Sequence, residues 1–246
     1  MTRTLATLTI RQLLGRRRTV LIGLVMALPI LIAVVYRFSD DAGDADAEFA
    51  VGLVSALIAS LLLPLVAVVL GTAALGSEIE DGTAVFLLTK PVARWRVMAV
   101  KMVVASVAVA MLVVPATMAT AWIVHGSPTA DGLMFGLGLG AAVSAVLYCA
   151  VFVALSAITS RALIFGLIYV FLWEAFATNL FGSLRWVSIR EYGSGWSDAL
   201  ISITDKDIFD PRLGVTAAVI GALVVLAVAG LLGTRALERF EIGERT

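Results

Sequence analysis

Apolar residues are grouped in long runs along this chain, and short polar segments separate the runs. A helix needs about 20 mostly apolar residues to cross roughly 30 Å of hydrocarbon. Six runs reach this length, and they predict spans at residues 19–36, 49–75, 102–124, 132–158, 162–181 and 213–234. The pattern therefore predicts an all-α integral membrane protein in which residues 1–246 form a single transmembrane domain.

The composition excludes an ordinary soluble domain. Hydrophobic residues make up 61% of the 246 positions and charged residues only 15%, and the mean hydropathy is +1.02. Soluble domains are closer to half apolar. Because the chain is so apolar, we expect the lipid bilayer to surround it, and we expect no nucleic-acid partner. The formal net charge of zero by itself says nothing about partners.

Basic residues are distributed unevenly between the two sides of the predicted bundle. With the N-terminus placed inside, 13 of the 18 Lys and Arg residues fall on the inner side. The first outer loop, "RFSDDAGDADAE", is acidic. Because Lys and Arg in short loops are retained in the cytoplasm, we expect a multi-pass protein of the cell (cytoplasmic) membrane with both termini cytoplasmic.

Residues 1–18 precede the first span and end in "RRR". The apolar run that follows is 18 residues long and lacks a convincing cleavage site, which argues against a removable secretory signal. The segment's apolar residues lie loosely on one side of a helix, a pattern typical of a helix in the membrane interface. We therefore expect an interfacial N-terminal helix, and the alternative is a frayed polar tail.

Chemistry-bearing residues are scarce. The single cysteine, Cys149, lies in the fourth predicted span, so neither an intrachain disulfide nor a cysteine-based metal site is expected. The single histidine, His125, opens a short outer turn, where a solvated loop residue is a better reading than a metal ligand. The chain contains no GxxxxGK[ST] phosphate-binding loop and no catalytic motif, so we do not expect it to be an enzyme by itself.

A dense polar segment at residues 78–96, "EIEDGTAVFLLTKPVARWR", separates the second and third spans. Gly82 can stop the preceding helix and Thr83 can cap a new one. Pro91 then opens the helix that enters the third span. The segment predicts a short cytoplasmic helix with an apolar knob at Val85, Phe86, Leu87 and Leu88. This knob could dock a cytoplasmic partner, or it could dip into the membrane interface as an amphipathic turn.

The same segment resembles the loop between the second and third spans of ABC type-2 exporter permeases. In that family, the loop carries the coupling helix that docks on the ATPase subunit. The positions that match its pattern are Glu78, Glu80, Asp81, Gly82, Thr83, Leu87, Leu88, Pro91 and Arg94. With Phe86 of the apolar knob, these form the expected ATPase-coupling residues. The resemblance implies no directly bound cofactor, with ATP and magnesium held on a partner ATPase subunit, and a second permease subunit in a homodimer or heterodimer.

Glu174 is the only acidic residue inside a predicted span, where an ionised side chain is expensive and usually has a role. We expect Glu174, together with the nearby Asn179, to take part in a translocation path or in gating, or else in packing. In the fourth span, small residues at positions 136, 140 and 144 favour close packing with another helix of the same subunit. The aromatic outer segment 182–212 resembles the short outer helices that precede the last span in type-2 permeases, and is expected to rest at the interface.

The sequence is best interpreted as the permease subunit of an ATP-driven ABC transporter, and export is the expected direction. Apolar drugs, peptides and lipids all fit the composition as substrates, and so does mechanical driving of a partner protein. The alternative is an ATP-independent channel or membrane scaffold in which the loop anchors another protein. A P-loop ATPase encoded beside this chain, or co-purifying with it, would separate these readings. A membrane enzyme is the weakest alternative.

Overall fold

The structure is a computed structural model that describes Thr9 and residues 16–39, 47–80, 93–127, 130–177, 187–203, 208, 209, 211 and 213–243. Within these residues the secondary structure is helical and contains no strand. The predicted all-α fold is therefore confirmed for this part of the chain. The interfacial N-terminal helix lies, apart from Thr9 and residues 16–18, outside the described residues.

Five of the described helices are long and apolar enough to cross a membrane. One of them is composite, because three consecutive segments follow one another without a break. The five are α2 (Arg16–Arg37), the second span made of α3 (Ala47–Leu53), η1 (Val54–Leu62) and α4 (Leu63–Glu80), then α6 (Arg94–His125), α7 (Leu133–Ile158) and α11 (Val215–Gly243). Their lengths and apolarity make the chain a multi-pass membrane protein.

The expected fifth span corresponds to a shorter apolar helix made of α8 (Ala162–Ile168) and η3 (Tyr169–Ala177). The predicted span continued to residue 181, and residues 178–186 lie outside the described part. The six-span layout therefore stays a prediction.

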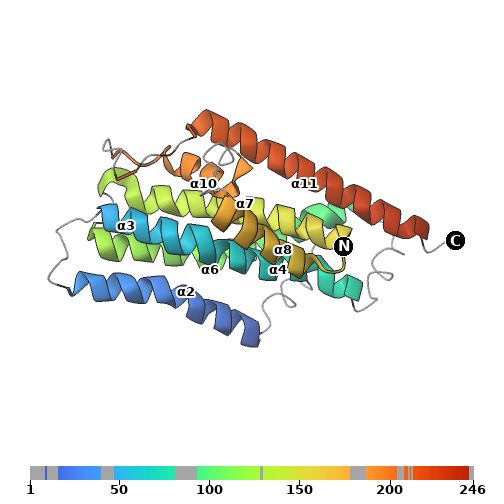
Figure 1. Cartoon of the computed structure of the whole chain (residues 1–246), viewed down its shortest axis with the longest axis horizontal. Coiled ribbons are helices and arrows are strands. Elements are labelled where there is room, and N and C mark those ends of the chain that lie inside the picture. The colour runs from blue at the N-terminus through green and yellow to red at the C-terminus, as the bar shows by residue number, and fades with distance from the viewer. Residues whose placement is uncertain are drawn as a thin grey trace.

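The central element of the bundle is α7. Two thirds of its apolar window (67%) is buried, compared with 17% for α2 and for α11. Figure 1 shows why: α2 and α11 lie on opposite flanks, with α7 between them. Large apolar side chains such as Leu24 and Leu231 are exposed on these flanking helices, as expected for surfaces in contact with lipid.

Several helices extend beyond the apolar runs that predicted them. The first helix begins at Arg16, the third span begins at Arg94, and the last helix continues to Gly243. Apolar content marks where a helix lies in hydrocarbon, whereas charged residues at its ends can continue the same backbone hydrogen bonds in the headgroup region. Helix length therefore exceeds the length of the apolar run.

The second span contains a π-helical stretch, η1, immediately before Pro64. Leu63 N–H donates to the carbonyl of Ile58, five residues earlier, rather than four. A proline inside a helix has no N–H to donate and its ring clashes with the carbonyl four residues earlier, so a wider turn just upstream relieves that conflict. The wider turn also changes which side chains face the centre of the bundle.

The outer segment does not simply rest at the surface of the bundle. Its described helix, α10 (Ile189–Ser197), packs against both α7 and α11, and alternate residues along it are buried. Gly140 on α7 faces Gly193 and Ser197 on α10, and Gly193 in turn faces Ser144. The small residues of α7 thus admit α10 at close range, which confirms the prediction of close packing within one subunit.

Candidate functional site

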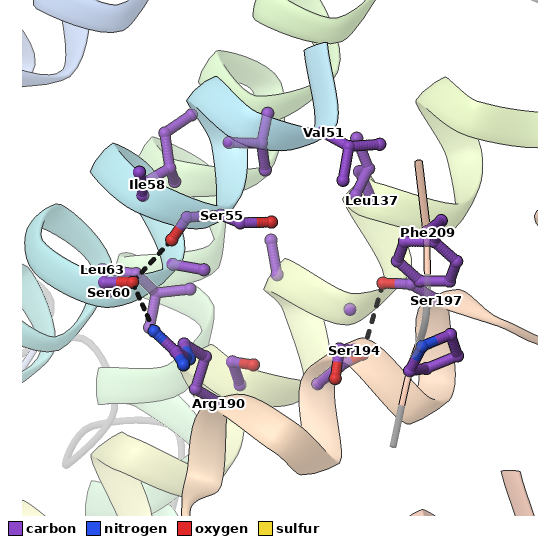
Figure 2. Close-up of a pocket in the computed structure, with 18 of the residues that line it drawn as sticks. Val51, Ser55, Ile58, Ser60, Leu63, Leu137, Arg190, Ser194, Ser197 and Phe209 are labelled. Atoms are coloured by element: carbon purple, nitrogen blue, oxygen red, sulfur yellow. Dashed lines mark hydrogen bonds between the residues drawn. The ribbon is translucent and has the colours of Figure 1, made fainter. Parts of the chain in front are cut away.

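A pocket of about 350 Å³ lies at the end of the bundle where α6 ends and α7 begins, hereafter the pocket end. Its walls are the π-helical part of the second span, the first half of α7, the helix α10 and the segment around Phe209. Figure 2 shows Val51, Ile58 and Leu137 on one side, with Arg190 and Ser194 of α10 on the other. The pocket therefore joins apolar and polar walls.

Arg190 is the centre of the polar wall. Its Nη1 donates to Ser60 Oγ at 2.7 Å, and its Nη2 lies 3.7 Å from Glu191 Oε1. Ser60 Oγ in turn donates to the carbonyl of Ser55 at 2.6 Å, five residues earlier, as the π-helical turn allows. These contacts connect α10 directly to the second span (Figure 2).

The exposed positions of the second span between residues 47 and 76 are unusual for a helix in a membrane. They are Glu48, Gly52, Ser55 and Ala56, which share one helix face and carry no large apolar side chain. The exposed faces of the other spans carry Val, Leu, Ile and Phe. Three of these four residues line the pocket, so the pocket opens on a polar, small-residue face.

Glu174 lies outside this pocket, at the contact between η3 and α10. It is buried, with 2% of its surface exposed, and accepts hydrogen bonds from Ser188 Oγ at 2.6 Å, Ile189 N–H at 2.9 Å and Tyr169 Oη at 3.3 Å. Ile189 is the first residue of α10, whose first amides have no partner within the helix. Glu174 thus serves as the N-terminal cap of α10 from a distant position in the sequence.

The same carboxyl group influences the next turn of α10. Burial, and secondarily the nearby Glu174, raises the pKa of the Tyr192 hydroxyl above its ordinary value. Both causes disfavour the charged phenolate, which suits a tyrosine whose ring lies beside Gly221 of α11 in a packed contact. A role of Glu174 in the translocation path or in gating stays a prediction, and its expected neighbour Asn179 lies outside the described residues.

Most of the expected coupling residues also lie outside the described part: Asp81, Gly82, Thr83, Phe86, Leu87, Leu88 and Pro91. Glu78 and Glu80 belong to the last turn of α4, and their side chains are not described. Arg94 is the first residue of α6 and is partly buried. The loop therefore connects the ends of α4 and α6 at one end of the bundle, hereafter the loop end.

His125 is not the solvated loop residue that the sequence suggested. It is the last residue of α6, only 3% exposed, and its Nε2 lies 3.5 Å from Asp131 Oδ2. The helix continues one residue past its apolar run, and the backbone then turns at Gly126, which has a positive φ of 76°. The imidazole is therefore buried at the end of α6 with the Asp131 carboxylate beside it.

Sequence reasoning missed the pocket residues Arg190 and Ser60. They are 130 positions apart, and neither belongs to a motif. One signal was available: Ser55 and Ser60 are polar positions that precede Pro64 within an otherwise apolar run, a combination typical of a locally irregular membrane helix. The contribution of α10 to the pocket could not be anticipated, because the sequence predicted short outer helices in this segment that rest at the membrane interface, and nothing local indicates packing against α7.

The described structure defines a class, a multi-pass helical membrane protein with a pocket of mixed polar and apolar lining among its helices. A family model described as ABC-2 family transporter protein matches residues 3–232, which is most of the chain. The chain therefore belongs to the ABC-2 transporter family and is a membrane transport component, as its resemblance to type-2 permeases predicted. No curated protein matches the chain.

Proposed function

We propose that this chain is the permease subunit of an ATP-driven exporter, in which a separate ATPase subunit binds the loop at residues 78–96. The observation that carries the proposal is the family match over residues 3–232 in a chain with several apolar spans. The chain has no phosphate-binding loop, so ATP and magnesium would be held by the ATPase. A second permease subunit, identical or different, completes the membrane domain.

The described helices support a mechanical route from the loop to the pocket. The loop joins the end of α4 to the start of α6, and both helices pack against α7 and against each other. The second span is continuous from Glu80 at the loop end to Val51 at the pocket. A displacement of the loop would therefore act on the pocket through one continuous helix. In this proposal both termini of the chain lie on the cytoplasmic side.

The test replaces two apolar residues of the knob, Leu87→Asp with Leu88→Asp. If the knob is buried in a groove of the ATPase, an unpaired carboxylate there costs about 3 kcal/mol or more, which weakens binding more than a hundredfold. Neither residue belongs to a predicted span, so membrane insertion should be unchanged. The measurements are a pull-down of the ATPase and ATP hydrolysis coupled to transport in reconstituted membranes.

The matched control places the same two charges at the pocket end. Phe38→Asp with Ser39→Asp alters two exposed residues that follow α2. This control should retain the ATPase, because its carboxylates lie at the other end of the bundle. If the Leu87 and Leu88 double variant keeps both its partner and full coupled transport, the loop is only a turn at the membrane surface, and the channel or scaffold alternative gains support.

A further inference from the structure

The pocket lined by Arg190 and Ser60 is large enough for the polar headgroup of one amphiphile. Its volume of about 350 Å³ is at the lower end of the range for ligand pockets, roughly 300–1,000 Å³. It can hold one polar group with the first part of an apolar chain, but not a whole lipid. The ligand it fits is therefore small or only partly enclosed.

The hydrogen-bonding groups of the pocket determine which polar group fits. Ser60 donates its hydroxyl hydrogen to the carbonyl of Ser55, Ser194 to that of Glu191, and Ser197 to that of Gly193. These hydroxyl oxygens have acceptor lone pairs, whereas the Arg190 guanidinium carries five N–H donors, more than are used by its two contacts with described residues, Ser60 and Glu191. A fitting ligand must both donate and accept hydrogen bonds, as hydroxyl groups do.

The charges in the pocket balance each other. Arg190 and Glu191 are 3.7 Å apart, and both side chains are mostly buried. An anionic group placed beside Arg190 would also approach Glu191, and a cationic group beside Glu191 would approach Arg190. At short range in a partly buried site, each repulsion offsets the corresponding attraction. The pair therefore favours an uncharged headgroup.

Two further features complete the site. Apolar side chains of Val51, Ile58 and Leu137 form the opposite wall, which suits an alkyl chain (Figure 2). The pocket opens on the face of Gly52, Ser55 and Ala56, which lacks the large apolar side chains present on the other exposed spans. This face suits contact with water better than contact with acyl chains.

We propose that this pocket binds the uncharged, hydroxyl-bearing headgroup of an amphiphile, with Arg190 and Ser60 as its principal polar contacts and the opening on the face of Ser55. A role of this site in transport rests on the proposed function, whereas the binding of the headgroup in the pocket does not. The headgroup can belong to a membrane lipid or to a free amphiphile, because both present the same chemistry.

The experiment uses cysteine labelling of the full chain in membrane vesicles without nucleotide. The native Cys149 is completely buried, so the unmodified chain should not react with a water-soluble maleimide. Ser55→Cys places a thiol at the opening and should react. Two controls define the assay: Ser39→Cys, exposed outside the pocket, should react, and Leu24→Cys, on the exposed apolar face of α2, should not.

Three amphiphiles with the same chain then compete with the label below their micelle concentrations: octyl glucoside, octyl phosphate and octyltrimethylammonium. Octyl glucoside should slow labelling of Ser55→Cys several-fold and more than either charged probe, and it should leave Ser39→Cys unaffected. Adding Arg190→Gln should weaken this protection about tenfold, since a hydrogen bond to a charged group is lost.

Gly52→Leu tests the same site without removing a polar contact. A Cβ atom added at Gly52 meets no atom within 4 Å, and the position is exposed, so the variant should fold. The bulk of the leucine would nevertheless block the opening and abolish protection. Gly23→Leu, equally unobstructed on α2, should keep protection. A comparison of phosphatidylcholine vesicles with and without a glycosyl diacylglycerol distinguishes a membrane lipid from a free amphiphile as the source of the headgroup. Slower labelling of Ser55→Cys in the presence of the glycolipid indicates a lipid headgroup. Protection by octyl glucoside but not by the glycolipid indicates a free amphiphile.

The proposal is overturned if Ser55→Cys does not react, if no probe protects it, or if a charged probe protects best. Protection that survives Gly52→Leu would also contradict it. None of these measurements involves the ATPase. Loss of ATPase coupling with intact protection would therefore contradict only the proposed function, and coupled transport without protection would contradict only the pocket assignment.

Discussion

Glu174 shows how a single side chain can position a helix that the sequence does not connect to it. Its hydrogen-bond donors Ser188 and Ile189 lie 14 and 15 positions further along the chain. A carboxyl group that accepts from the first amide of a helix satisfies a donor that the helix itself cannot. Glu174 therefore fixes where α10 begins, and through α10 it holds Arg190 at the pocket.

We expect Glu174→Leu to reduce stability, because the Ser188 hydroxyl and the Ile189 amide would each lose a buried acceptor, at about 1–3 kcal/mol apiece. Glu174→Gln keeps an oxygen acceptor and should cost about 1 kcal/mol. Thermal unfolding of the solubilised protein measures both. The positioning role is refuted if Glu174→Leu unfolds at the wild-type temperature, and a severe transport defect in well-folded Glu174→Gln protein would instead favour gating.

The sequence identified Glu174 because an acid inside an apolar run is conspicuous. It could not identify the partners of this acid, because hydrogen bonds between distant segments leave no local pattern. Arg190 illustrates the same limit more strongly: its charge placed it in an outer loop, whereas the packing of α10 brings it beside Ser60. Local chemistry marks unusual residues, and only the tertiary arrangement pairs them.

The contact between α7 and α10 depends on the absence of side chains at a few positions. A Cβ atom added to Gly140 would overlap Ser197 Oγ and lie 2.6 Å from the carbonyl oxygen of Gly193. A backbone carbonyl cannot move away without moving its helix. The spacing of small residues predicted such a contact. The π-helical turns η1 and η3 were not predicted: η1 directly precedes Pro64, whereas η3 contains no proline that would indicate it.

Gly140→Val should therefore separate α7 from α10 and lower stability by about 1–3 kcal/mol, the usual cost of overpacking. Gly230→Val is the matched control, because a Cβ atom added at Gly230 of α11 meets no atom within 4 Å. The thermal stability of both solubilised variants is compared with that of the wild type. Equal stability of the two variants would show that the close approach of α7 and α10 contributes nothing.

At the scale of the whole molecule, five of the six spans predicted from hydrophobic runs coincide with helices that are long and apolar enough to cross a membrane, since the cost of exposing polar groups to hydrocarbon leaves few alternatives. The boundaries were less accurate, because charged residues continue several helices into the headgroup region. The orientation in the membrane rests on the distribution of basic residues and stays a prediction.

This orientation can be tested with single cysteines in two loops. A membrane-impermeant maleimide applied to intact cells should label Ala45→Cys, in the acidic loop after the first span, and should not label Ala84→Cys in the loop between the second and third spans. The native Cys149 is buried and should therefore contribute no background labelling. Labelling of Ala84→Cys, but not of Ala45→Cys, would reverse the predicted topology.

The position of α10 between α7 and α11 has a consequence for biogenesis. With the sequence "IREYGSGWS", α10 is too short and too polar to insert into a bilayer alone, so it reaches its place only by docking against helices already there. One wall of its groove, α11, is synthesised after α10 itself. The part of the pocket wall that α10 supplies is therefore held on both sides only once α11 has been inserted, and a product truncated before α11 should lack this support.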